Sequence, residues 1–83
     1  MKRVLDRKIK LIWDFRGPTA AKTAEHYEKH LKEYIFNEEL KFDTTGHDHL
    51  SDMHSIVFLV VAEFEMAQAR DDLKPHRGEV YQD

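Results

Sequence analysis

The most constraining feature of this 83-residue chain is one apolar run, Ile-Val-Phe-Leu-Val-Val-Ala, over residues 56–62. Its length and its β-branched residues are typical of a strand, and it is far too short to cross a bilayer. The strand that we predict, residues 54–61, is apolar on both faces over most of its length. Such a strand must be covered on both faces. We therefore expect helices on one face of the sheet and a second copy of the chain on the other.

The remaining elements follow from changes in hydrophobic period. Residues 8–15 alternate between apolar and polar, which predicts a strand. From Pro18 the apolar residues recur at steps of four and three as far as Ile35, which predicts an amphipathic helix that stops near Asn37. Weaker patterns predict a short strand, a second helix and a brief edge strand, over residues 40–45, 62–73 and 79–81 respectively.

The order β-α-β-β-α-β predicts a ferredoxin-like α+β fold, with a four-stranded antiparallel sheet and two helices on one face. We expect residues 1–83 to form a single domain, whose small core favours homodimerisation. The chain has no cysteine, which excludes disulfides and zinc-thiolate sites. A net charge of −3 with interspersed signs argues against nucleic acid as a partner. Without a secretory apolar segment or a membrane span, we expect a cytoplasmic protein with no membrane partner.

Residues 8–81, by the order and length of their elements, resemble the dimeric α+β barrel superfamily. Locally, Trp-Asp-Phe-Arg-Gly-Pro at 13–18, followed by a helix with His26-Tyr27 and His30-Leu31, is similar to the first strand and helix of EthD-like proteins. The resemblance implies a homodimer in which two open sheet faces meet. The superfamily includes enzymes of several kinds and proteins with no known activity, so the resemblance leaves the reaction open.

Three of the six histidines, His47, His49 and His54, lie close together ahead of the apolar run. We interpret this segment as the connection between the second and third strands. In extended backbone His47 and His49 project to the same side, and His54 could approach them if the connection folds back. Such a set suits zinc, nickel or copper, with Asp48 or Asp52 supplying an oxygen. The alternative, which we favour, is a solvated polar loop, because the spacing matches no established metal motif.

The predicted first helix carries His26 and His30 four residues apart. Tyr27 stands where the zinc-protease signature has glutamate, so protease chemistry is unsupported. We expect His26 to be solvated and His30 to be half-buried beside Leu31.

Three further side chains have both a structural and a ligand-binding interpretation. Trp13 is expected in the core or at an interface, with the wall of a ligand pocket as the alternative. Arg16 and Arg77 could bind an anionic ligand, although pairing with surface carboxylates such as Asp14 is the simpler expectation.

Our leading hypothesis is a homodimeric module that binds a small organic ligand at the sheet face. Ligand-binding residues would be Trp13, Arg16 and His30, and acid-base candidates would be His30, His49 and His54. Whether the protein is an enzyme, and with which cofactor, stays open. The alternatives are a non-enzymatic structural or regulatory dimer, and a metal-binding protein that uses His47, His49 and His54.

Overall fold

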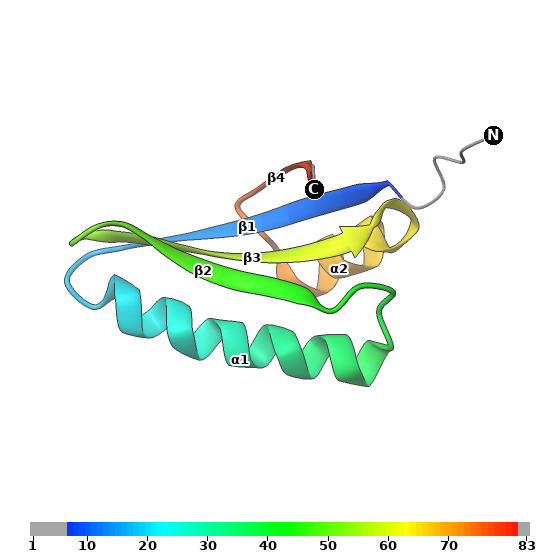
Figure 1. Cartoon of the computed structure of the whole chain (residues 1–83), viewed down its shortest axis with the longest axis horizontal. Helices are drawn as coiled ribbons and strands as arrows, with labels where there is room; N and C mark the ends of the chain where they lie inside the picture. The colour runs from blue at the N-terminus through cyan, green and yellow to red at the C-terminus, as the bar shows by residue number, and fades with distance from the viewer. Residues whose placement is uncertain (1–6, 82–83) are drawn as a thin grey trace.

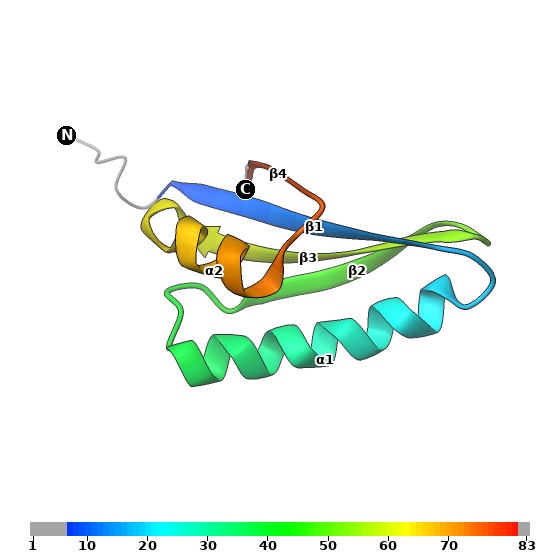
Figure 2. The same cartoon turned by 180° about the vertical axis from the view of Figure 1, so that it is seen from behind.

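A computed structural model describes residues 7–81 as a four-stranded antiparallel sheet with two helices on one face (Figure 1). The strand order is β2-β3-β1-β4. The view from behind shows α1 and α2 on the same side of the sheet (Figure 2). The α+β, ferredoxin-like prediction is confirmed. In chain order the elements are β1 (Lys8–Arg16), α1 (Ala20–Glu38), β2 (Thr44–Ser51), β3 (His54–Ala62), the 3-10 turn η1 (Glu63–Glu65), α2 (Met66–Leu73) and β4 (Arg77–Val80).

The core lies between the sheet and the helices. The two central strands pair along their whole length, with Leu11 opposite Leu59 and Trp13 opposite Val57. Alternate residues of β1 and β3 therefore point towards the helices, as the period-two pattern predicts. Trp13 is 3% exposed, and its Nε1 donates a hydrogen bond to the carbonyl of Leu73 at 3.0 Å. This bond ties β1 to the carboxyl end of α2.

Helix α1 packs on the sheet through Ala20, Ala24, Leu31 and Ile35. Their spacing of four, seven and four places them on one helix face. The helix ends at Glu38, and Glu39 adopts the left-handed conformation with φ of 52°. The prediction that Asn37 stops the helix is therefore wrong by two residues. Among residues 7–81, no helix is long and apolar enough to span a membrane.

The histidine-rich segment is a strand and not a loop. β2 runs from Thr44 to Ser51, whereas the sequence predicted a strand at 40–45, and the turn to β3 is only Asp52 and Met53. The register shifts between His49 and Ser51, so Leu50 is an extra residue in a β-bulge. Glycine, histidine and aspartate have weak strand propensity, so backbone pairing with the apolar β3 imposes this strand. Because β2 is an edge strand, its polar side chains stay close to water.

The sheet face opposite the helices, here the open face, is partly shielded within the chain. Ile12, Ile56, Val60 and Ala62 lie on it, yet none is more than 8% exposed. Phe58 lies across Gly46, and Lys10 Nζ lies 4.5 Å from the centre of the Phe58 ring. Long side chains on neighbouring strands thus shield part of the apolar surface of β3 from solvent.

Candidate metal centre between α1 and β2

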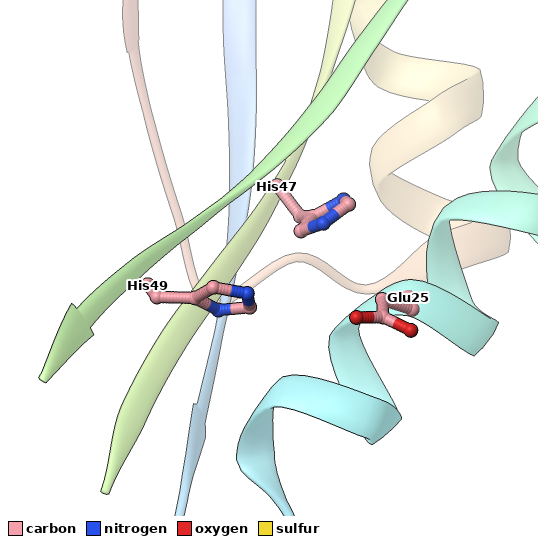
Figure 3. A group of neighbouring side chains, drawn as sticks. All are labelled: Glu25, His47 and His49. Atoms are coloured by element: carbon pink, nitrogen blue, oxygen red, sulfur yellow. The ribbon is translucent and has the colours of Figure 1, made fainter. Parts of the chain in front are cut away.

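The side chains that β2 directs towards the helices are polar. Thr45, His47 and His49 pair with Leu59, Val57 and Ser55 of β3, so they share the helix-facing side of the sheet. Glu25 and Glu28, about one turn apart on α1, lie opposite them, as Figure 3 shows for Glu25. We call Glu25, Glu28, Thr45, His47 and His49 the α1–β2 polar cluster.

Glu28 holds His47 in place. Its Oε1 lies 2.6 Å from His47 Nδ1, and its Oε2 accepts a hydrogen bond from Thr45 Oγ1 at 2.9 Å. The Glu28 side chain is only 15% exposed. Burial alone would raise the pKa of Glu28, but the hydrogen bonds from His47 and Thr45, with Lys32 nearby, outweigh burial and lower it. Glu28 is therefore an ionised acceptor that fixes one imidazole nitrogen.

Ser55 plays the corresponding part for His49. The His49 Nδ1 lies 2.9 Å from Ser55 Oγ, and Ser55 is 1% exposed. The two imidazole rings have centroids 5.5 Å apart. Since both Nδ1 atoms are engaged, the Nε2 atoms are the ring nitrogens left to bind a ligand.

Glu25 completes a potential metal-ligand set. One ligand atom from each of Glu25, His47 and His49 lies within 4.8 Å of the others, and the three side chains converge between α1 and β2 (Figure 3). Within residues 7–81, the Glu25 carboxylate has no hydrogen-bond or ion-pair partner that competes for it. Zinc bonds of about 2.0 Å place ligand atoms roughly 3.3 Å apart, so the ligand atoms need to approach one another by at most about 1.5 Å.

His54 is not brought together with His47 and His49. It lies on the open face, where its Nε2 is 2.9 Å from Asp14 Oδ1. Asp48, opposite Ile56, also belongs to the open face, and Asp52 lies in the turn. One ion therefore cannot bind all three histidines in this arrangement. The structure supplies Glu25 instead, which no local sequence pattern connects to the histidines.

The helix histidines lie away from the cluster. His26 is exposed, as predicted. The expectation of a half-buried His30 is wrong, because its side chain is 72% exposed, with Nδ1 3.8 Å from Glu33 Oε1. Leu31 and Ile35 define the buried stripe of α1, and a residue one position before Leu31 is rotated out of it.

The other candidate residues are also dispersed. Trp13 is a core residue, as the simpler expectation held. Arg16 is exposed on the open face, with a guanidinium nitrogen 3.4 Å from His54 Nδ1. Arg77 donates to both carboxylate oxygens of Asp14, at 3.0 and 3.2 Å, which confirms the expected surface pairing.

A small hollow of about 130 Å³ lies on α1 at Lys22, Glu25, His26 and Lys29, and two larger hollows lie on the helix side of the sheet. One, of about 680 Å³, is open to solvent and reaches the α1–β2 polar cluster at Glu28 and Thr45. The other, of about 370 Å³, lies between α2 and β4 and is mainly apolar, with Ile9, Leu11, Met66, Pro75 and Val80 among its walls. Trp13, Arg16 and His30 line neither hollow.

Comparisons with protein-family models, with curated proteins and with solved structures found no match to this chain. The function is therefore inferred from the geometry of the chain's own side chains.

Proposed function

We propose that the protein binds a divalent transition-metal ion through His47, His49 and Glu25. The observation that carries this proposal is the convergence of one ligand atom from each of these residues within 4.8 Å. In addition, Glu28 and Ser55 each engage the Nδ1 atom of one histidine. Metal-binding histidines almost always donate their other N–H to a carboxylate, carbonyl or water. Glu28 is such a carboxylate, and Ser55 offers a hydroxyl in the same role.

The donor set selects the class of ion. Two imidazole nitrogens and one carboxylate oxygen suit zinc, nickel and copper better than magnesium or calcium, which prefer oxygen ligands. Three protein ligands leave one position of a tetrahedral ion for water or another small ligand. The open hollow beside Glu28 and Thr45 brings solvent to this part of the molecule.

The metal proposal is tested by titrating metal-free protein with Zn²⁺ and Ni²⁺ against a chromophoric chelator. We expect binding of one ion per chain, and we expect His49→Ala and Glu25→Gln each to weaken binding by at least tenfold, about 1.4 kcal/mol. His30→Ala is the matched control, because it removes an exposed imidazole from α1, the helix that carries Glu25. Absence of stoichiometric binding, or equal losses in His30→Ala and His49→Ala, would refute the proposal.

A second candidate function is binding of a small organic ligand in the hollow between α2 and β4. Its volume of about 370 Å³ lies in the range of small-molecule sites, and its walls are mainly apolar. Arg70 at this hollow suits a ligand with an acidic group. Titration with small aromatic carboxylates should shift the NMR signals of Met66 and Val80. Shifts elsewhere only, or none, would exclude this site.

We also propose that two copies associate through their open faces, as the resemblance to the dimeric α+β barrel superfamily implies. Within residues 7–81 no helix covers this face, and Phe58 is at its centre opposite Ile12. Light scattering should give a dimer for the wild type and a monomer for Phe58→Glu. Phe36→Glu is the control, because Phe36 is 82% exposed on α1. A wild-type monomer at micromolar concentration would contradict the proposal.

A further inference from the structure

A second cluster of charged side chains lies on the open face, across the sheet from the α1–β2 polar cluster. It consists of Asp14 and Arg16 from β1, His54 from β3 and Arg77 from β4, and we call it the open-face cluster. Arg16 and His54 are cross-strand partners. Three strands therefore bring these side chains together.

Asp14 is the fixed centre of this cluster. Its carboxylate lies 2.9 Å from His54 Nε2 and accepts two hydrogen bonds from Arg77, at 3.0 and 3.2 Å. The hydrogen bond from Arg77, against the opposing effect of burial and with help from His54, lowers the pKa of Asp14 to about 2. Asp14 is thus ionised and fully engaged. It is suited to orient the His54 ring and not to react itself.

Arg16 meets the other nitrogen of the same ring. Its guanidinium lies 3.4 Å from His54 Nδ1. Arginine only donates, so in this contact Nδ1 is the acceptor and the ring proton is on Nε2, facing Asp14. Within residues 7–81, Arg16 has no carboxylate partner. Two arginines and one aspartate leave the cluster one positive charge, in a chain whose net charge is −3.

We propose that Arg16 and His54 bind a small oxyanion of the phosphate type, either free phosphate or a phosphate monoester. The oxyanion accepts hydrogen bonds from the Arg16 guanidinium and from His54 Nδ1, which takes one proton from solvent on binding. Asp14 on the far side of the ring stabilises the resulting imidazolium. A dianion matches these two cationic donors better than a monoanionic carboxylate does.

The surroundings of His54 are consistent with such a site. The charged groups that face it are Asp14 and Arg16 from β1 and, through Asp14, Arg77 from β4. Its partner on β2 is Ser51, which is uncharged, and the exposed Asp52 lies in the adjoining turn. The His54 side chain is 19% exposed, so a small anion can reach a ring that its neighbours hold in place. Arg16 and His54 form the last pair of the β1–β3 ladder, four residues from Ile12 and Phe58, so the cluster lies at the end of the open face and not at the centre, where two copies would meet.

The test is an NMR titration of the His54 ring nitrogens with inorganic phosphate and, in parallel, with a phosphate monoester, phenyl phosphate. A chelator is present throughout, so the outcome does not depend on the metal proposal. Sodium chloride at matched ionic strength controls for screening. We expect a saturable shift of Nδ1 towards the protonated form, and we expect Arg16→Gln to weaken phosphate binding at least tenfold. Tighter binding of phenyl phosphate would identify a monoester site, and equal or weaker binding would identify a free-phosphate site.

Lys22→Gln is the matched control, because it removes one exposed positive charge from α1 outside the cluster. Its phosphate affinity should stay within about twofold of the wild type. Asp14→Asn should weaken binding and reduce the protonation shift of His54, since the ring loses its negative partner. A non-saturable response to both anions, or equal responses in Arg16→Gln and Lys22→Gln, would overturn the proposal.

Discussion

Gly46 of β2 lies directly beneath the ring of Phe58, its cross-strand partner on β3. A Cβ atom built on Gly46 would lie 2.5 Å from Phe58 Cζ and 2.7 Å from Phe58 Cε2. The ring can cover the edge strand only because Gly46 has no side chain. This packing also positions the ring beneath Lys10 Nζ, at 4.5 Å.

Replacing Gly46 with alanine should therefore destabilise the protein, although alanine normally stabilises a strand relative to glycine. We expect a loss of roughly 1–3 kcal/mol in the free energy of unfolding, measured with urea, because the Phe58 ring must move. In a Phe58→Ala background the same change should be neutral or stabilising. An equal loss in both backgrounds would show that the ring is not the cause.

Glu28→Gln should weaken zinc binding by about 10- to 100-fold while it leaves all three proposed ligands in place. The reason is that the ionised Glu28 carboxylate, 2.6 Å from His47 Nδ1, holds the ring in the orientation that metal binding requires. The chelator competition used for the wild type measures this change. Glu33→Gln is the control, since its side chain is 73% exposed on the same helix. Equal affinities for Glu28→Gln and Glu33→Gln would contradict the role of Glu28.

The lowered pKa of Asp14 predicts how the stability of the protein depends on acid pH. Its pKa is about 2 in the folded protein and 3.8 ordinarily, so its stabilisation is complete above about pH 4 and is lost as the pH falls towards 2. Asp14→Asn should cost roughly 1–2 kcal/mol at pH 6, after allowance for solvent screening. Urea unfolding of the wild type and of Asp14→Asn at pH 6 and at pH 2 measures the difference in their free energies of unfolding, which should be smaller at pH 2. Asp52→Asn, in the exposed turn, should show no such trend.

Trp13→Phe should destabilise the fold by roughly 1–3 kcal/mol. Phenylalanine cannot donate to the Leu73 carbonyl, and it leaves part of the Trp13 site empty beside Tyr27, whose ring centre is 5.2 Å away. Thermal and urea unfolding of the two proteins provide the measurement. A change below about 0.5 kcal/mol would mean that the hydrogen bond and the packing contribute little.

The elements predicted best from the sequence are those whose stability depends on their own hydrophobic pattern. β1, α1 and β3 bury apolar faces that repeat with strand or helix periodicity, and their predicted ranges differ from the structure by only a few residues. The sequence prediction misplaced β2 because several of its residues, Thr44–Ser51, have weak strand propensity. Its strand conformation depends on pairing with β3, and the local sequence pattern of β2 does not reveal that pairing.

The candidate site was predictable only in part for a related reason. Extended backbone was enough to predict that His47 and His49 point to the same side. The contribution of Glu25 depends on how α1 packs across β2, and the separation of His54 depends on the hairpin register. Neither relation is encoded in residue spacing.

The bulge at Leu50 has a wider consequence for this hairpin. Side chains alternate along a strand, so shifting β2 by one residue against β3 would turn His47 and His49 towards the open face, beside His54. The histidines stay on two faces because Leu50 bulges out of the ladder, which keeps His49 opposite Ser55 although Ser51 pairs with His54. Deleting Leu50 would remove the bulge and keep these pairs, so His47 and His49 should remain on the helix side, apart from His54.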